Sequence, residues 1–338
     1  MKAMVLERPN QMALQTVDDL HPNLGEVLIK TTHAGICGTD TKIYEGKIPA
    51  NYPLVMGHEI VGEIVDGDTN EVAKRGARVL VDPVLYCGSC FHCKQGETNL
   101  CPNGGIMGRE VNGGFADYCI AKTSHIYPLP EQLDSKTGAA IQVLTTVMHA
   151  QNKGDVVTGD AVVVSGLGVT GLMHIQLAKA RGAKVVVGTS RNAHKREIAL
   201  ALGADYAVSH GEEAKKTILE VTEGIGADIV IECVGNLSML AEAVELARLG
   251  GKVIPFGIYP SGQAELPFYD FYFKELQIIN VRAAKGSDFS SCIKLVSAGE
   301  VDLEALITHS LPYTELNSAI RMLMEPSDER IKVILEAA

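Results

Sequence analysis

The sequence predicts an α/β protein of two domains, in which a mostly antiparallel β domain precedes a doubly wound parallel sheet. Three observations support this fold class. Short apolar strands broken by Gly, Pro and Asn fill the chain up to residue 148. Beyond it, β-branched runs alternate with helical periods that close on glycine. The chain has 338 residues, 46% of them hydrophobic, so it is long enough to bury two cores.

The first predicted domain covers residues 1–148 and consists mainly of strands. These strands are expected at Glu26 to Lys30, Glu59 to Val65, Arg78 to Val81 and Phe115 to Ala121. Each run is short and lies between turn residues, which is typical of antiparallel sheets. A helical stretch over Ala139 to His149 closes the domain.

The second predicted domain covers residues 149–285 and alternates strands with helices. The strands are expected at Val162 to Ser165, Lys184 to Gly188, Tyr206 to Val208, Asp228 to Cys233, Lys252 to Phe256 and Gln277 to Val281. Between them lie a helix over Thr170 to Arg181, stopped by Gly182, and another over Ala193 to Leu202, capped by Gly203. Six strands with intervening helices fit a doubly wound sheet.

The last predicted segment, residues 286–338, returns to the first domain. It contains a helix, an extended stretch near Leu306 to Leu311, a second helix and a closing strand over Lys332 to Leu335. We expect these residues to fold back onto the first domain.

Composition excludes several classes of partner. A formal net charge of -11 repels a phosphate backbone, and no cluster of five or more Lys and Arg offsets it, so nucleic acid is not expected. The polar N-terminus and the absence of a long apolar run argue against a membrane and for a cytoplasmic protein. Eight cysteines without a signal peptide, four of them between Cys87 and Cys101, favour metal binding over disulfides.

A glycine-rich motif follows the first strand of the second domain. Gly166, Leu167, Gly168, Val169, Thr170 and Gly171 form a G-x-G-x-x-G sequence that opens a helix. We expect Gly166 to form the tight turn, Gly168 to let backbone N–H groups approach a pyrophosphate, and Gly171 to let the helix pack on the sheet. The helix N-terminus adds partial positive charge. The motif therefore predicts a dinucleotide site in a Rossmann-type domain.

The end of the next strand predicts which dinucleotide binds. An NAD site usually has Asp or Glu there, about 20 residues after the glycines, whereas this chain has Ser190 and Arg191. A hydroxyl and a guanidinium can both donate to the 2′-phosphate of NADP, and Lys195 adds charge one turn later. NADP is therefore favoured over NAD. The alternative is that Arg191 is a solvated surface residue and other groups hold the ribose.

A cysteine-rich loop predicts a structural zinc site. Its four thiols are spaced C-x2-C-x2-C-x7-C, at Cys87, Cys90, Cys93 and Cys101. Four thiolates on a short loop can close a tetrahedral shell, which leaves no open position for a substrate. The site is therefore expected to stabilise a lobe of the domain. A metal-free loop with four exposed thiols is the disfavoured alternative.

A second group of metal-binding residues stands earlier in the chain, where Cys37 lies in a G-I-C-G-T-D sequence and His58 precedes Glu59. With the cysteine loop and the dinucleotide motif, these residues resemble the zinc-containing medium-chain alcohol dehydrogenases, nearest the polyol, threonine and sugar dehydrogenase branch. The resemblance spans the whole chain. It implies a GroES-like catalytic domain, a Rossmann domain, a catalytic zinc in the cleft between them, and a homodimer or homotetramer.

The resemblance also implies a ligand set for the catalytic zinc. Cys37 and His58 match ligands, and Glu59 matches a glutamate beside the metal that can enter its shell. The third ligand of the family is usually Cys or Glu after a Gly-Ala-Ala segment, whereas here that segment leads to Gln142. Glutamine is a neutral and weaker donor. Gln142 is thus a weak ligand, or Glu59 or water completes the shell.

Three further residues receive roles from the same resemblance. Thr39 matches the hydroxyl that accepts a hydrogen bond from the substrate alcohol and passes its proton outward. Lys42 stands where many relatives have a relay histidine, and it serves the relay, binds an anionic substrate group, or points to water. Arg282, after the last strand of the second domain, contacts cofactor or substrate, or forms a structural salt bridge.

These observations predict an oxidoreductase that contains two zinc ions per chain. It would transfer hydride between NADP(H) and an alcohol, polyol or sugar, with carbonyl reduction in the reverse direction. One alternative is an NAD-dependent polyol or threonine dehydrogenase. Another is a zinc-stabilised nucleotide-binding regulator without catalysis, which Gln142 and Lys42 favour. A zinc-free quinone or enoyl reductase is disfavoured, because such relatives lack the cysteine loop.

Overall fold

The computed structural model describes residues 1–70, 74–259 and 266–337, and the chain divides into two compact units. Unit 1 comprises Met1–Thr145, Ala283–Ser297 and Leu303–Ala338, and unit 2 comprises Thr146–Arg282 and Ala298–Asp302. The sequence pattern predicted boundaries after residues 148 and 285. The observed changes fall three residues earlier in each case, and the first lies inside one continuous helix, α3 (Ser135–Gly154).

Unit 1 is built mainly from strands. They are β1 (Lys2–Arg8), β2 (Gln11–Thr16), β3 (Glu26–Gly35), β4 (Leu54–Val55), β5 (Glu59–Gly67), β6 (Arg78–Val81), β7 (Val84–Leu85), β8 (Gly105–Ile106), β9 (Tyr118–Lys122), β10 (Ile126–Pro128), β17 (Ile307–Pro312) and β18 (Lys332–Glu336). The largest sheet has the order β10-β6-β5-β3-β18-β17, and β9 also pairs with β3. Only the β17–β18 pair of this sheet is parallel among the described strands.

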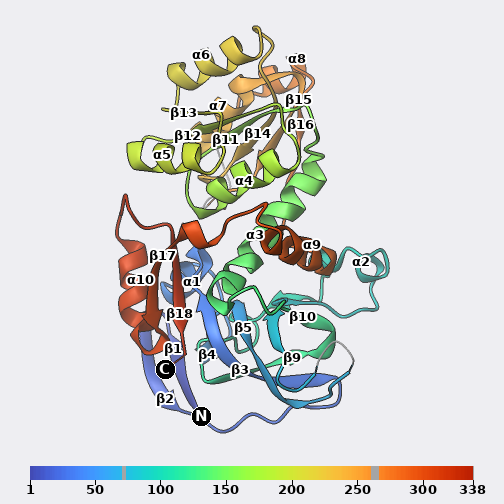
Figure 1. The fold of residues 1–338 in the computed structure, drawn as a ribbon, viewed down its shortest axis with the longest axis vertical. Helices are drawn as coiled ribbons and strands as arrows, with labels where there is room; N and C mark the ends of the chain where they lie inside the picture. The colour runs from blue at the N-terminus through green and yellow to red at the C-terminus, as the bar shows by residue number, and fades with distance from the viewer. Residues whose placement is uncertain (71–73, 260–265, 338) are drawn as a thin grey trace. The chain divides into compact units, whose positions relative to one another are not determined.

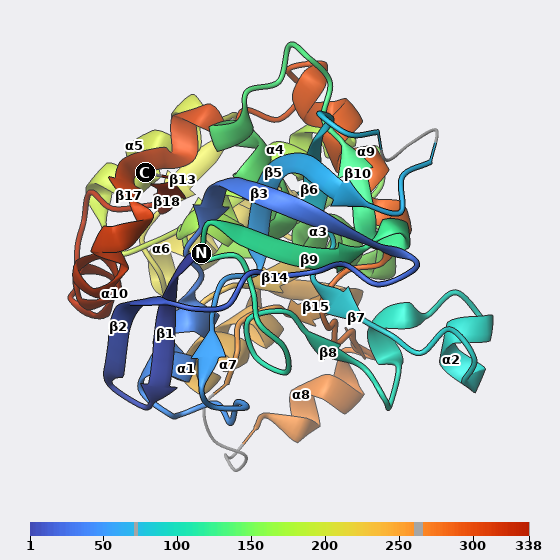
Figure 2. The same cartoon turned by 90° about the horizontal axis from the view of Figure 1, so that it is seen from below.

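The last strand of the chain joins unit 1 beside one of its first strands. β18 pairs antiparallel with β3, with Ile334 opposite Gly35, and β3 pairs on its other side with β5, with Gly35 opposite Glu59. Figure 2 shows β9 lying alongside β3 farther along the same strand. Strands from both ends of the chain therefore lie in one sheet of unit 1, although residues 298–302, inside the predicted returning segment, belong to unit 2.

Besides the first part of α3, unit 1 contains four helices among its described residues, of which α9 is the longest. They are α1 (Gly38–Tyr44), α2 (Phe91–Lys94), α9 (Gly286–Ser297) and α10 (Leu316–Met324), with 3-10 turns at Thr98–Leu100, Thr123–His125, Glu304–Leu306 and Tyr313–Glu315. Apolar residues of β1, β4, α1 and α10 pack into one core, and a second core lies between β3, β5, β6 and β9. Both cores include residues of β3, with Val27 and Ile29 in one and Ala34 in the other.

Unit 2 is a six-stranded parallel sheet with helices on both faces. Its strands are β11 (Ala161–Ser165), β12 (Val185–Thr189), β13 (Tyr206–Val208), β14 (Ala227–Glu232), β15 (Ala247–Pro255) and β16 (Gln277–Ile278), in the order β13-β12-β11-β14-β15-β16. The order reverses direction at β11, as in doubly wound folds. The predicted fold class is therefore confirmed for both parts of the chain.

Five helices cover this sheet. They are α4 (Val169–Ala180), α5 (Ala193–Ala201), α6 (Glu212–Val221), α7 (Leu237–Leu246) and α8 (Phe268–Phe273). Figure 1 shows α4 and α5 on one face of the strands and α6 and α7 on the other. Side chains of α6 and α7 pack on valines of β11, β12 and β14 to form one core of the unit. Burial on both faces explains why these strands are continuous apolar runs.

Several predicted elements differ from the structure at their ends. The strand predicted over Phe115 to Ala121 begins only at Tyr118. Phe115 and Ala116 lie in an irregular segment before it, and their side chains pack into the core of unit 1. The strand predicted over Gln277 to Val281 ends at Ile278. No helix within residues 1–70, 74–259 and 266–337 combines the length and apolar character needed to cross a membrane.

Candidate functional site

Cys37 lies at the junction between β3 and α1. It is the N-cap residue of α1 and has an extended backbone, with φ −103° and ψ 155°. Its N–H donates to the Asp40 carboxylate at 2.8 Å, and its carbonyl accepts the Asp40 N–H at 3.0 Å. These two hydrogen bonds close the first turn of the helix and fix the direction of the Cys37 side chain. Thr39 and Lys42, on the same short helix, are half-buried.

His58 and Glu59 lie at the start of β5, and both side chains are buried. Gly57 precedes them with φ +99°, and a Cβ at that position would lie 2.7 Å from the Phe115 ring, so only glycine fits this turn. The turn directs the two side chains toward Cys37. The Cys37 sulfur, one His58 nitrogen and one Glu59 oxygen lie within 4.8 Å of one another.

Asp40 connects the two halves of this cluster. Its Oδ1 lies 3.4 Å from His58 Nδ1, while its Oδ2 accepts the Cys37 N–H. Burial alone lowers the pKa of His58, but the Asp40 carboxylate and the Cys37 sulfur raise it well above its ordinary value. A carboxylate on one ring nitrogen is the arrangement that orients metal-binding histidines, and a metal ion on the ring takes the place of its proton.

Glu59 forms a buried ion pair with a residue from the other end of the chain. Its Oε2 accepts from Lys332 Nζ, and Lys332 is only 2% exposed. The other oxygen, Oε1, is buried and has no hydrogen-bond partner among the described residues. Such an atom is rare in folded proteins. A divalent cation beside it would satisfy the atom, and a thiolate, an imidazole and a carboxylate form a donor set that suits zinc.

Gln142 lies buried in the first half of α3, within unit 1. The Thr145 hydroxyl donates to its backbone carbonyl at 2.6 Å. Among the described residues, no hydrogen bond joins the Gln142 side chain to Cys37, His58 or Glu59. The role of Gln142 as a fourth donor therefore stays a prediction.

The four cysteines of the loop at residues 87–101 come together as the spacing predicted. Zinc–sulfur bonds are about 2.3 Å long, so sulfurs at the corners of a tetrahedron lie about 3.8 Å apart. The sulfurs of Cys87 and Cys93 are 4.0 Å apart, and those of Cys90 and Cys101 are 3.9 Å apart. All four lie within 4.8 Å of one another. The spacing between the sulfurs is therefore that of a four-cysteine zinc shell.

Backbone N–H groups point at these sulfurs. The N–H of Cys90 donates to Cys87 Sγ at 3.4 Å, and that of Cys93 donates to Cys90 Sγ at 3.5 Å. Hydrogen bonds from Ser89 and Cys90 lower the pKa of Cys87 to about 5. These hydrogen bonds stabilise the thiolate of Cys87, the form that binds a metal, whereas burial and the neighbouring cysteines raise the pKa of Cys93 to about 12.

The glycine motif forms the turn between β11 and α4. Gly166 has φ +96°, and a Cβ on it would meet Val234 at 2.6 Å. A Cβ on Gly171 would lie 1.9 Å from the Gly166 carbonyl oxygen, so α4 packs directly on the turn. Around Gly168, the N-cap of α4, there is open space at the helix N-terminus. The three glycines thus have the geometry expected of a dinucleotide-binding turn.

The predicted specificity residues follow β12 directly. β12 ends at Thr189, so Ser190 and Arg191 begin the loop that leads to α5. Ser190 Oγ accepts the Asn192 N–H at 3.2 Å, which leaves the hydroxyl hydrogen free to donate to a ligand. Arg191 is exposed and Lys195 is half-buried in the first turn of α5.

One residue at this loop, Arg196, was not predicted from the sequence as a cofactor-site residue. Arg196 donates to the carbonyl of Ser190 at 2.7 Å and to that of Arg191 at 3.1 Å, so its guanidinium lies at the loop. Its position one helical turn after Asn192 is the signal that could have found it. His210 lies against Thr189, with Nδ1 2.9 Å from its hydroxyl. Arg282 is exposed at the end of the main segment of unit 2, and its role stays a prediction.

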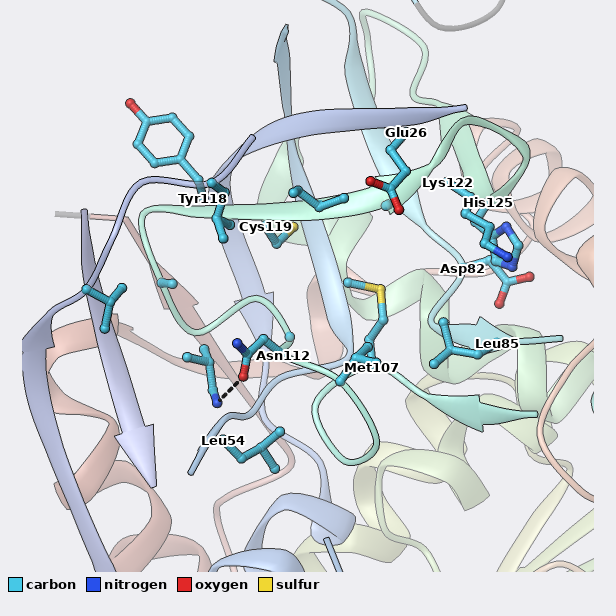
Figure 3. Close-up of a pocket in the computed structure, with 18 of the residues that line it drawn as sticks. Glu26, Leu54, Asp82, Leu85, Met107, Asn112, Tyr118, Cys119, Lys122 and His125 are labelled. Atoms are coloured by element: carbon cyan, nitrogen blue, oxygen red, sulfur yellow. Dashed lines mark hydrogen bonds between the residues drawn. The ribbon is translucent and has the colours of Figure 1, made fainter. Parts of the chain in front are cut away.

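A cavity of about 830 Å³ in unit 1 is bordered by Cys87 of the cysteine loop but by none of Cys37, His58 and Glu59. Figure 3 shows Tyr118 on one side of it, Leu54 on another, and Asp82 and His125 together at one end. Burial raises the pKa of Asp82 to about 7 and lowers that of His125 to about 4. The candidate site is therefore defined by its side-chain clusters and not by this cavity.

Comparison with known proteins supports the same interpretation in both units. Residues 23–131 match the family profile of the alcohol dehydrogenase GroES-like domain, and residues 169–298 match that of the zinc-binding dehydrogenases. The chain is 32% identical to a sorbitol dehydrogenase of Halalkalibacterium halodurans, with 99% of both chains covered. It is also 32% identical to a D-arabitol-phosphate dehydrogenase of Enterococcus avium, covering 100% of this chain and 97% of that one.

Solved structures resemble the chain over its full length. A zinc-binding dehydrogenase from Sinorhizobium meliloti 1021, bound to NADP, has a TM-score of 0.92 at 30% identity and covers 99% of this chain and 98% of its own. An alcohol dehydrogenase from Escherichia coli CFT073, in complex with NADH, also has a TM-score of 0.92, at 32% identity with 99% of both chains covered. Both nicotinamide dinucleotides thus occur among its structural relatives.

The glycine motif allows stability and cofactor binding to be tested separately. Gly171→Ala forces the new Cβ against the Gly166 carbonyl, and we expect it to lower the free energy of unfolding by about 1–3 kcal/mol. Gly168→Ala places a Cβ in open space and should leave stability almost unchanged while weakening dinucleotide binding. Thermal unfolding and dinucleotide titration of both variants check this. Equal melting temperatures for the two variants would contradict the packing argument.

Proposed function

This chain belongs to the zinc-type medium-chain alcohol dehydrogenase family, and from that premise we propose that it oxidises a polyol, sugar or related alcohol with NADP. It is an NAD(P)-dependent oxidoreductase, and carbonyl reduction with NADPH is the reverse reaction. The observation that carries the proposal is the convergence of Cys37, His58 and Glu59 within 4.8 Å in a chain that also contains a dinucleotide-binding turn. The small-molecule partner is thus an alcohol or its carbonyl product.

We propose that Cys37 and His58 hold the catalytic zinc, and that Gln142, Glu59 or water completes its shell. Zinc supplies Lewis-acid chemistry, which polarises the oxygen of a bound alcohol. Asp40 is proposed to orient both protein ligands, because its Oδ2 accepts the Cys37 N–H and its Oδ1 lies 3.4 Å from His58 Nδ1. A ligand held in this way keeps its direction while substrate exchanges. The four loop cysteines are proposed to hold a second, structural zinc.

Proton movement is assigned to α1. Thr39 is half-buried two residues after Cys37, where a hydroxyl can accept a hydrogen bond from the substrate alcohol and pass the proton outward. Lys42, one turn later and also half-buried, either continues the relay or binds an anionic group of the substrate. Hydride transfer itself is the chemistry of the nicotinamide cofactor.

The preference for NADP is proposed from the loop after β12. An Asp or Glu at position 190 would repel a 2′-phosphate, whereas Ser190 has a hydroxyl hydrogen to donate. Arg191 belongs to this loop itself. The Arg196 guanidinium also lies there, because it donates to the carbonyls of Ser190 and Arg191. The relative with bound NADP is consistent with this preference, and the relative with bound NADH keeps the NAD-dependent alternative open.

The test of the proposal combines turnover with metal analysis. We expect NADPH formation at 340 nm with one or more members of a panel of alcohols, polyols and aldoses, and about two zinc per chain. Cys37→Ser should remove one zinc and reduce kcat at least a thousandfold, while dinucleotide binding persists. Cys90→Ser should remove the other zinc and lower the melting temperature, because it opens the four-cysteine shell.

Two outcomes would contradict the proposal. Zinc bound only at the cysteine loop, with tight NADPH binding and no turnover on the panel, would favour a non-catalytic regulator. Near-normal kcat in Cys37→Ser would exclude the catalytic assignment of this residue.

Cofactor preference is tested by Ser190→Asp, with Ser190→Ala as the matched control. The aspartate places a negative charge where the 2′-phosphate is expected, so kcat/KM with NADP should fall at least tenfold and kcat/KM with NAD should rise. Ser190→Ala removes the hydroxyl donor without adding charge, and a smaller loss with NADP is expected. An unchanged ratio of the two kcat/KM values in Ser190→Asp would show that the phosphate lies elsewhere.

We also propose that the protein is cytoplasmic and that it forms a homo-oligomer. The exposed surface of α8 supports the oligomer. Phe268, Tyr269, Tyr272 and Phe273 on this helix are each at least 65% exposed. α8 precedes β16, an edge strand whose outer side pairs with no described strand. Aromatic side chains gathered on a surface mark protein interfaces.

The oligomer is tested by light scattering on a gel-filtration column. We expect a dimer or tetramer, and we expect Tyr272→Glu to dissociate it, because the charge would have to be buried in the interface. Tyr206→Glu, on the opposite edge strand β13, is the matched control and should leave the mass unchanged. A wild-type protein that elutes as a monomer at micromolar concentration would overturn the proposal.

A further inference from the structure

Lys332 is an unusual residue for its position, since it is a lysine only 2% exposed on the last strand of the chain. Lysine side chains are almost never fully buried unless they are paired. Its Nζ has two partners: the Glu59 carboxylate and the backbone carbonyl of Ile36 at 3.0 Å. Ile36 directly precedes Cys37, and Glu59 directly follows His58. One ammonium group thus contacts both segments that present the predicted zinc ligands.

The ion pair lies directly against the backbone of β3 at Gly35. Gly35 lies on β3 between Glu59 of β5 and Ile334 of β18. A Cβ on Gly35 would lie 1.9 Å from Glu59 Oε2 and 3.0 Å from Lys332 Nζ. The ion pair therefore occupies the space that a side chain at position 35 would fill, and the glycine is what lets the carboxylate lie against β3.

The charges of the site balance only when Lys332 is counted. A Cys37 thiolate and the carboxylates of Asp40 and Glu59 bring three negative charges into a buried region. A divalent metal ion contributes two positive charges, and Lys332 contributes the third. Without Lys332 the loaded site would carry a net negative charge, and Glu59 would have no cation other than the metal.

We propose that Lys332 is a positioning residue of the metal site, which holds Glu59 beside the metal and keeps it from becoming a full ligand. Lys332 engages Oε2, so the carboxylate can offer only Oε1 to the metal, and its charge is already partly neutralised. The metal then keeps one exchangeable position for substrate. This inference rests on the proposed function, because it requires a catalytic metal at Cys37 and His58.

The test uses cobalt in place of zinc, because the visible absorption of Co²⁺ changes with its ligands and weakens as its coordination number rises. Subtracting the spectrum of Cys37→Ser from that of the wild type isolates the absorption of the cobalt at Cys37 and His58. In Lys332→Met we expect Glu59 to bind the metal. The isolated absorption should then weaken, cobalt loss to a chelator should slow several-fold, and kcat should fall at least tenfold with little change in KM.

Three further variants complete the test. Lys332→Arg keeps the charge and should restore the spectrum and most of kcat. The double variant Glu59→Gln/Lys332→Met removes both charges and should return the spectrum and the rate of cobalt loss toward the wild-type values. Lys294→Met, at an exposed position on α9, is the control for loss of a lysine. Lys332→Gln keeps an N–H donor for Ile36 and replaces Lys332→Met in the assay if that variant does not fold.

The outcomes separate the two proposals. If the wild type binds cobalt only at the cysteine loop, the proposed function fails. If the wild type binds cobalt at Cys37 and His58 and has turnover, but the Lys332 variants match Lys294→Met in spectrum and cobalt loss and differ only in melting temperature, the proposed function stands. In that case Lys332 is structural only, and the inference is overturned.

Discussion

The pairing of β18 with β3 is the constraint on which the metal cluster depends. It places the C-terminal strand beside the strand that leads into Cys37, with Ile334 opposite Gly35. Lys332, two residues earlier on the same face, then reaches Glu59 and Ile36. Removing one member of a buried ion pair typically costs about 3–5 kcal/mol, because the other charge is left uncompensated. The last strand therefore contributes both to the sheet and to the electrostatics of the cluster.

A second feature common to both units is a polar group that lies directly against a glycine. In unit 1 the carboxylate of Glu59 occupies the place of a side chain at Gly35, and in unit 2 the Gly166 carbonyl occupies that of a side chain at Gly171. In each case a polar group lies against glycine and takes a direction that a larger residue would prevent. Functional groups are thus held by rigid strands and helix ends, which orient them more accurately than mobile loops.

The two metal clusters differ in how the chain builds them. The four loop cysteines lie within fifteen residues, and their sulfurs meet through local turns and the short helix α2. The other cluster joins β3, α1 and β5 and is completed electrostatically by β18. A local site can form around its metal with little help from the rest of the fold. The cluster of Cys37, His58 and Glu59 forms only when the sheet has formed. Ligands held by a rigid sheet suit a catalytic metal site, which must keep one position open for substrate.

The sequence by itself determined the fold class, the cysteine loop, the glycine turn and the residues at the end of β12, because each is encoded by spacing over a few residues. Periodicity also predicted the six strands of unit 2, of which β11, β12 and β14 are buried on both faces. Only the tertiary structure decided that Lys332 pairs with Glu59, 273 residues away, and which atoms of Asp40 face Cys37 and His58. It also placed the first unit boundary within α3. The helical periodicity of the sequence continues across this boundary, so the pattern does not mark it. Contacts of this kind depend on strand register and on space left by glycines such as Gly35, and no local pattern of residues encodes either.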